Sequence, residues 1–431
     1  MLVRIINTLL IFLMIDFFGL LPESTIIKVV VDILLLGSAF YIIIRKKKKP
    51  NKIEKFEFSL FVFFFAVAVF TYFRGGSTFV DIYKFARIYF PLLLAFPLMY
   101  DINYSNNGFL YYRKLFQVIA ICITVMLILI SVFHVEFFSS WPRLTYDFQD
   151  GDYIPGLKRV YIYSSFTFPV IEFIFLTYSV FLGERVNKGL FALITVGFLL
   201  QGFRSYILAT ILIVTISIFG YLSKQQNFSI IKFLRKNFIV FILCLSVGFT
   251  FLGSRIVSGI SDFVNVSGTF GSRILLDAFR LKVFAEHPLF GVGFLHNDAE
   301  RAKEMGVTSS EELRSALTDN NYDTLQQSAI YSLRATDSGY LDILIQFGLI
   351  GVFIFMILYF SFYFKLGKVL TSSVNTGAKV YILSLRTVLL LLIFTLISHA
   401  AITNIYGLLP LSFALAFAQC QLNKDQHEFS T

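Results

Sequence analysis

Long apolar runs separated by short polar segments dominate this sequence. A helix that crosses a bilayer needs about 20 apolar residues, and by that rule the runs predict about twelve membrane-spanning helices. The charge of Arg204 interrupts one of these runs, which predicts a tight hairpin between two spans. The expected fold class is therefore an all-α polytopic membrane protein. The predicted spans lie near residues 5–21, 26–44, 57–73, 85–100, 115–133, 161–182, 189–203, 205–222, 238–253, 339–364, 380–398 and 403–421.

One long polar segment, residues 254–338, interrupts the apolar pattern. It contains Arg273, Asp277 and Arg280, whose spacing predicts one face of an amphipathic helix. The sequence therefore predicts a chain in three parts. They are a first transmembrane part of about nine spans (1–253), a large extracytoplasmic loop with amphipathic helices (254–338), and about three further spans with a cytoplasmic tail (339–431).

Composition supports the membrane class and argues against a nucleic-acid partner. Hydrophobic residues make up 57% of the chain and charged residues 15%, whereas soluble domains contain about 25% charged residues. The net charge of +10 is concentrated, because Arg45–Lys55 alone holds seven basic residues directly after an apolar run. Such a cluster is typical of the cytoplasmic end of a span. The three cysteines, Cys122, Cys244 and Cys420, lie within apolar runs without metal-ligand spacing and are expected to be structural.

The basic residues of the short loops predict the orientation. Short cytoplasmic loops carry an excess of Lys and Arg, whereas long loops are exempt from this rule. With the N-terminus inside, the inner loops hold most of the basic residues and the outer loops hold few. Both termini are therefore expected in the cytoplasm, and the segment 254–338 outside it. The inner set includes Arg45–Lys49, Arg113–Lys114, Arg185, Lys188, Lys224, Lys365 and Lys379, and the outer set includes Arg74, Arg143, Lys158 and Arg159.

Several charged residues near the predicted outer face are candidates for ligand binding, because charges at membrane depth are costly and usually functional. Lys84 and Arg87 lie where a helix enters the bilayer, and Arg204 stands at the outer end of a span. Each could instead be an interfacial residue that extends its charged end to water. Likewise, Arg273 and Arg280 could belong to a solvated helix face, with Asp277 four residues after Arg273. The mid-span residues Glu172 and Arg386 are expected to pair inside the bundle.

Positive charge at one membrane face suits a phosphorylated ligand. Guanidinium groups bind phosphate in a bidentate geometry that lysine does not reproduce. The sequence contains no His/Cys cluster with metal-ligand spacing, and arginines would stabilise the charge of a departing diphosphate. His287 lies beside Pro288, where a capping role is the simpler interpretation. His296 and Asp337 are candidates for a general base, which must lie within about 3 Å of the proton that it removes.

Three motifs resemble the signature of the O-antigen ligase and polymerase family. They are the arginine of the amphipathic helix, the turn EHPLFGVGF (Glu286–Phe294), and SGYLDILIQFGLIG (Ser338–Gly351); GFRSYILA around Arg204 resembles an earlier family element. The resemblance covers about residues 199–351. It implies a metal-independent glycosyltransferase without cofactor in the bacterial inner membrane, whose donor and acceptor are undecaprenyl-diphosphate-linked oligosaccharides. A chain-length regulator protein would be a further candidate partner.

The resemblance also assigns roles to the candidate residues. Arg204 and Arg273 would hold the diphosphate, and Asp337 would act as the base. Gly291 and Gly293 would allow a tight turn beneath the substrate, although a plain surface turn explains them equally well. Substrate-binding positions would be Arg280, Lys84, Arg87, Tyr340, His287 and His296.

One departure from the family pattern favours a polymerase over a ligase. The ligases usually carry a histidine just before the Tyr-Leu pair, where this chain has Thr336-Asp337-Ser338. The expected function is therefore the joining of lipid-linked repeat units by a polymerase at the outer leaflet. Two alternatives remain: an O-antigen ligase that transfers glycan to lipid A core, and a flippase for lipid-linked sugar. A flippase should line a central cavity with cationic groups, whereas here they concentrate at the outer face.

Overall fold

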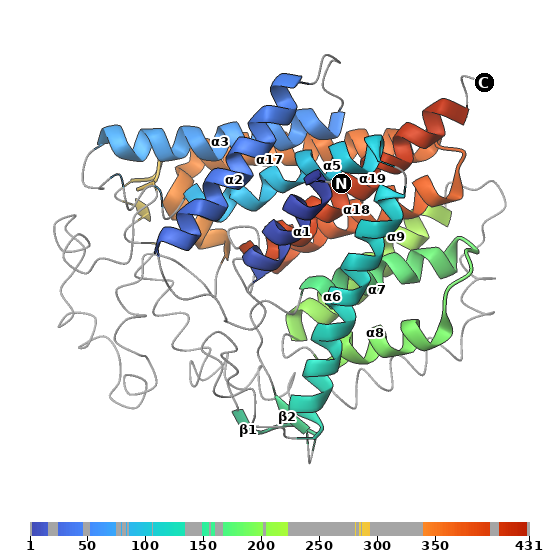
Figure 1. Cartoon of the computed structure of the whole chain (residues 1–431). Coiled ribbons are helices and arrows are strands. Elements are labelled where there is room, and N and C mark those ends of the chain that lie inside the picture. The colour runs from blue at the N-terminus through green and yellow to red at the C-terminus, as the bar shows by residue number, and fades with distance from the viewer. Residues whose placement is uncertain are drawn as a thin grey trace.

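The computed structural model describes twelve helices and one small hairpin. It describes residues 2–15, 25–45, 52–74, 79, 83, 86–105, 107–133, 149–154, 157–159, 167–200, 204–222, 281, 284–285, 287–293, 339–396 and 405–428. The predicted helical fold class is confirmed. The helices are α1 (Leu2–Ile15), α2 (Thr25–Arg45), α3 (Lys52–Arg74), the 3-10 helix η1 (Arg87–Leu94), α5 (Ala95–Tyr104), α6 (Gly108–Ser131), α7 (Thr167–Phe181), α8 (Lys188–Leu200), α9 (Arg204–Leu222), α17 (Gly339–Ser372), α18 (Thr376–Thr395) and α19 (Ile405–Glu428) (Figure 1).

Every predicted span except 238–253, which lies outside the described residues, overlaps a helix of this set. Four helices are long and apolar enough to cross a membrane: Lys52–Phe73, Gly108–Ser131, Gly339–Ser372 and Thr376–Thr395. Several others are apolar but shorter than the usual span. The protein is therefore a membrane protein, and the number of twelve spans stays a prediction. α8 ends at Leu200 and α9 begins at Arg204, and residues 201–203, where the tight hairpin is predicted, lie outside the described residues.

A small antiparallel hairpin was not predicted. Its strands, β1 (Gln149–Ile154) and β2 (Leu157–Arg159), pair Gln149 with Arg159 and Ile154 with Leu157. In the sequence they flank Pro155-Gly156, a dipeptide that is typical of turns. The hairpin lies beside the C-terminal end of α6 (Figure 1).

The centre of the bundle is α19, which is buried on all sides from residue 407 to residue 421. It packs against α18, α5, η1, α7 and α6. Phe413 and Phe417 of α19 contact the ring of Phe116 on α6, with centroid distances of 5.3 and 6.0 Å. A helix that is apolar all round must be buried in this way. The helices that carry the candidate site are α3, η1 and α17; η1 packs against α19 and α3, and α3 packs against α17.

Two polar clusters inside the bundle hold helices together. Arg113 on α6 forms a two-pronged ion pair with Glu172 on α7, with Nη1–Oε2 and Nη2–Oε1 distances of 2.5 and 2.7 Å. The predicted internal pairing of Glu172 is therefore confirmed. Arg113 was expected in a loop, but α6 begins earlier than predicted and includes it. Arg386 contacts no carboxylate among the described residues, and its guanidinium lies 4.4 Å from the ring centre of Tyr363.

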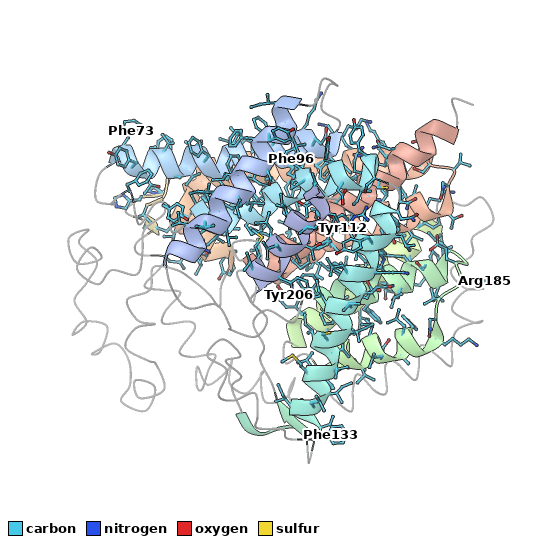
Figure 2. The ribbon with its side chains drawn as sticks, viewed as in Figure 1. Phe73, Phe96, Tyr112, Phe133, Arg185 and Tyr206 are labelled. Carbon is cyan, nitrogen blue, oxygen red and sulfur yellow. The ribbon has the colours of Figure 1, made fainter. Side chains whose placement is uncertain are left out.

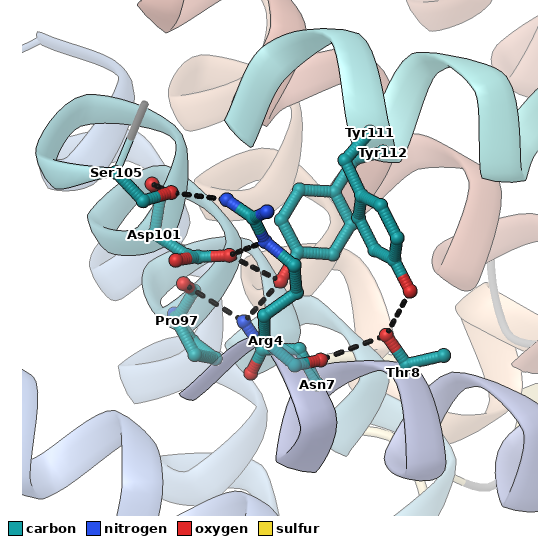
Figure 3. Close-up of polar contacts among 8 residues, drawn as sticks. All are labelled: Arg4, Asn7, Thr8, Pro97, Asp101, Ser105, Tyr111 and Tyr112. Carbon is teal, nitrogen blue, oxygen red and sulfur yellow. Dashed lines mark hydrogen bonds and ion pairs between the residues drawn. The ribbon is translucent and has the colours of Figure 1, made fainter. Parts of the chain in front are cut away.

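The second cluster ties α1 to α5 and α6 (Figure 3). Arg4 pairs with Asp101 at 3.1 Å and donates to the hydroxyl of Ser105 at 2.6 Å. The hydroxyl of Tyr112 donates to the same carboxylate of Asp101 at 2.8 Å. Asn7 donates to the carbonyl of Pro97 at 3.1 Å. Each of the donors named here has an acceptor, which is what burial inside a bundle favours.

Candidate functional site

The two halves of the signature meet at a break in α17. At Gly348 the backbone has φ 63° and ψ −177°, so the helix is interrupted there. In a continuous helix, the N–H groups of residues 349 and 350 would donate to the carbonyls of residues 345 and 346. The segment His287–Gly293 replaces both bonds. Its four backbone contacts are Val292 N–H to Ile345 O (2.7 Å), Gly293 N–H to Gln346 O (3.0 Å), Leu349 N–H to Pro288 O (2.8 Å) and Ile350 N–H to Leu289 O (3.0 Å).

We call this contact the signature junction: residues 287–293 together with residues 345–350. It pairs two carbonyls and two amides that the break would otherwise leave without partners. Buried backbone groups left unpaired are costly, and most costly in an apolar environment. The inserted segment is therefore part of the helix framework, and the interpretation of HPLFGVG as a plain surface turn is wrong.

Two glycines make the junction sterically possible. Gly291 and Gly348 both have positive φ, 65° and 63°. A Cβ atom on Gly291 would lie 2.3 Å from the carbonyl oxygen of Ile345, and one on Gly348 would lie 2.3 Å from the amide nitrogen of Gly291. Both obstacles are backbone atoms, so no side-chain rotation relieves them. The glycines at positions 291 and 348 therefore allow the backbone of residues 287–293 to lie against the backbone of α17, in addition to allowing the turn.

The junction rests on the end of α3. A Cβ atom on Gly293 would lie 2.0 Å from the hydroxyl oxygen of Thr71, so the two segments touch. The ring of Phe290 lies 5.6 Å from the ring of Phe70. Figure 2 shows Phe73, at the end of the same helix, far from Arg185 at the opposite side of the bundle. The signature therefore lies at the α3 end of the bundle, away from the turn between α7 and α8.

A buried polar pair adjoins the junction and was missed in the sequence. Asp342 is fully buried in the first turn of α17, and the side-chain amide of Gln346 donates to its Oδ1 at 2.7 Å. The carbonyl of Gln346 also accepts the junction bond from Gly293. The signal that could have revealed this pair is its i, i+4 spacing on an otherwise apolar helix.

A second charged group lies between α2 and η1. The Nε atom of Arg87 is 2.5 Å from Oδ2 of Asp32, and the hydroxyl of Tyr83 donates to the same oxygen at 2.5 Å. The side chain of Asp32 is 4% exposed and that of Arg87 is 30% exposed. Burial, and then the hydrogen bond to Asp32, raise the pKa of Tyr83 well above its usual value, so its phenol remains a neutral donor.

Two other predicted residues are placed at the ends of the signature. His287 is half-buried, its amide donates to Phe284 O at 3.0 Å, and its carbonyl accepts the amide of Gly291 at 3.0 Å. These backbone bonds close the turn, and the role of the His287 side chain stays a prediction. Tyr340 is 43% exposed, and its amide donates to Leu396 O at the end of α18 at 3.1 Å.

Comparison with known families identifies this region. Residues 189–356 match the family model described as O-antigen ligase. This part of the chain is similar to the O-antigen ligase family. The match includes α8, α9 and the complete signature junction, and it confirms the family resemblance seen in the sequence. A search of curated proteins found no match.

The O-antigen ligase family consists of membrane glycosyltransferase-type enzymes that act on lipid-linked polysaccharides in lipopolysaccharide biosynthesis. The group formed by Asp32, Tyr83 and Arg87 lies outside the matched segment. The described residues contain no cluster of three or more His, Cys, Asp or Glu side chains that could hold a metal ion. Lys84, Arg273, Arg280, His296 and Asp337, together with the side chain of Arg204, lie outside the part that the structure describes.

Proposed function

We propose that this protein is a polysaccharide polymerase that joins lipid-linked repeat units at the outer leaflet of the bacterial inner membrane. The observation that carries the proposal is the signature junction. It fixes both ends of the segment 294–338 on the same end of the bundle, because Gly293 bonds to α17 and α17 itself begins at Gly339. Both ends of that segment are therefore anchored near α3 and the start of α17, and we place the substrate site there.

The proposed reaction is a glycosyl transfer with a diphosphate leaving group. The bond between the anomeric carbon of the growing glycan and its undecaprenyl diphosphate breaks. A new bond forms from that carbon to a hydroxyl of the incoming lipid-linked repeat unit, and the proton of this hydroxyl passes to Asp337. Arg204, Arg273 and Arg280 would stabilise the negative charge of the departing diphosphate. Because the leaving group is already good, orientation and charge stabilisation supply most of the catalysis.

Asp337 favours a polymerase over a ligase. It precedes Tyr340 at the place where the ligases usually carry a histidine that assists the acceptor. The second candidate function is nevertheless ligation, and it is favoured by the description of the matching family model itself. A flippase is disfavoured because it should line a central cavity with cationic groups, whereas the sequence concentrates them at the predicted outer face.

The acceptor decides between the two transfer reactions. The full-length protein in nanodiscs, supplied with a synthetic undecaprenyl-diphosphate repeat unit, should produce a ladder of longer lipid-linked glycans. Addition of lipid A core should not change the products. Transfer to lipid A core without a ladder would establish a ligase, and no product with either acceptor would refute glycosyl transfer.

Gene deletion gives the matching test in cells. Loss of a polymerase should leave lipid capped with a single repeat, whereas loss of a ligase should accumulate long glycans that are not attached to lipid A core. The second pattern would contradict the proposal.

A further inference from the structure

The bundle contains two triads of the same composition, and only one has its arginine fully engaged. Arg87, Asp32 and Tyr83 form one triad, and Arg4, Asp101 and Tyr112 form the other. In each, an arginine Nε and a tyrosine hydroxyl contact the same oxygen of a buried aspartate. The exposure of the side chains is also alike, 30% and 4% for Arg87 and Asp32, and 26% and 5% for Arg4 and Asp101.

The two triads lie at opposite ends of one helical rod. η1 continues into α5 with helical torsions at Leu94 and Ala95, and Arg87 and Asp101 lie near the two ends of this rod. Seven 3-10 steps of about 2.0 Å and seven α-helical steps of about 1.5 Å place these residues about 25 Å apart. This length is close to the hydrocarbon thickness of a bilayer, about 30 Å.

The Arg87 triad lies on the side of the signature junction. Tyr89, two residues after Arg87, stacks on Phe64 of α3 with a centroid distance of 3.6 Å. Phe64 in turn lies 5.8 Å from the ring of Phe347, which directly precedes Gly348. Arg87 precedes Tyr89 at the start of η1, and Thr71 follows Phe64 near the end of α3. Thr71 touches Gly293. Arg87 and the junction therefore belong to the same end of the bundle.

The guanidinium groups of the two triads differ in what else they contact. The Nη2 atom of Arg4 donates to Ser105 at 2.6 Å, and the guanidinium lies 5.0 Å from the ring centre of Tyr111 (Figure 3). For Arg87, the described part of the chain supplies the contact of Nε with Asp32 and no acceptor for the two terminal nitrogens. These nitrogens form the flat, two-donor edge that suits phosphate.

From this contrast we propose that Asp32 and Tyr83 are positioning residues, which hold the terminal nitrogens of Arg87 against the diphosphate of a polyprenyl carrier. This inference rests on the proposed function and adds two residues from outside the family segment. Asp32 holds the guanidinium by the ion pair at Nε, and the hydroxyl of Tyr83 donates to the same carboxylate oxygen. Asp32 also neutralises the charge of Arg87, so the net electrostatic attraction for an anion must come from the other arginines. The contribution of Arg87 is the position of its two terminal nitrogen donors.

The test measures the binding of undecaprenyl diphosphate to the full-length protein in nanodiscs of zwitterionic lipid, together with the thermal midpoint without ligand. Asp32→Asn, Tyr83→Phe and Arg87→Lys are compared with the matched variants Asp101→Asn and Tyr112→Phe. Asp32→Asn and Arg87→Lys should weaken binding roughly ten- to hundredfold, the range for a charged hydrogen bond. The Asp101 and Tyr112 variants should lower the midpoint without changing the dissociation constant.

A double variant distinguishes a positioning role of Asp32 from a purely structural role. Because Asp32 acts through Arg87, the double variant Asp32→Asn/Arg87→Lys should bind no more weakly than Arg87→Lys alone. If Asp32→Asn lowers only the thermal midpoint, as Asp101→Asn does, then the triad is a structural clamp and the inference is overturned. Competition with phosphatidylglycerol at equal concentration should displace little carrier. Full displacement would show a general phospholipid headgroup site and would also overturn it.

The experiments distinguish a failure of this inference from a failure of the proposed function. If the variants alter carrier binding but the wild-type protein produces no ladder, the polymerase proposal fails and the positioning inference stands. If the ladder forms equally well, with unchanged KM, in Asp32→Asn and Arg87→Lys, the polymerase proposal stands and the positioning inference fails.

Discussion

Gly348→Ala should detach the signature from the bundle while leaving the remaining helices folded. At φ 63° and ψ −177°, Gly348 adopts a conformation that is almost restricted to glycine, and an alanine there costs about 1–3 kcal/mol in backbone strain. Its Cβ would also lie 2.3 Å from the amide nitrogen of Gly291 and 2.4 Å from the carbonyl oxygen of Leu289. Relief of this clash requires the two segments to separate.

The magnitude follows from the bonds that separation breaks. The junction has four backbone hydrogen bonds, and each contributes about 1 kcal/mol net. Their loss lowers the free energy of local opening by about 4 kcal/mol, which is roughly a thousandfold in the opening equilibrium. Hydrogen exchange reports this equilibrium at individual amides, and the amides that donate in the junction belong to Val292, Gly293, Leu349 and Ile350.

Gly37→Ala is the matched control. Gly37 lies inside α2, and a Cβ there would meet nothing within 4 Å, so alanine should be neutral or stabilise the helix by about 0.5–1 kcal/mol. In Gly348→Ala the four junction amides should exchange faster and glycan elongation should cease, with unchanged amounts of protein in the membrane. Wild-type protection of these amides in Gly348→Ala would refute the reasoning, because it would show that the crossing tolerates a side chain.

Three further predictions concern charged residues. Glu172→Ala should destabilise the bundle by about 3–5 kcal/mol in a thermal unfolding assay, because the buried Arg113 loses both ion-pair contacts; an unchanged midpoint would contradict the pairing. Arg204→Ala and Arg273→Ala should each abolish elongation without changing protein abundance, as measured by glycan length on gels, and wild-type length would remove them from the site. Asp337→Asn should slow transfer by roughly 10²–10⁴-fold without weakening carrier binding, in a single-turnover assay; undiminished rate would leave only a positional role.

Hydropathy predicted where helices lie but not how they end or pair. The apolar runs located most of the helices because apolar length is a property of local sequence. They did not indicate that α17 continues to Ser372, nor that it breaks at Gly348. A glycine within an apolar run is compatible with an unbroken helix, and only the approach of residues 287–293 makes the break favourable.

The partners of the charged residues were equally inaccessible to sequence reasoning. Glu172 was expected to pair inside the bundle, but the choice of Arg113 depends on which faces of α6 and α7 meet. Arg87 was predicted as a phosphate ligand from its place near the interface, whereas Asp32 was not considered because it lies on another helix, two helices earlier in the chain. Long-range pairing is a property of packing, and a single sequence contains no record of it.

The signature junction explains why the motif contains glycines and few chemically reactive side chains. Its four bonds use backbone atoms alone, so they depend on side-chain identity where a Cβ would collide, at Gly291, Gly293 and Gly348. Substrate groups can then be placed on neighbouring elements without changing the anchor. On this view the residues HPLFGVG and FGLIG have a structural role, and the surrounding arginines and acids bind and activate the substrate. Asp32, Tyr83 and Arg87 fit that division, because they hold one guanidinium at the same end of the bundle without contributing to the junction itself.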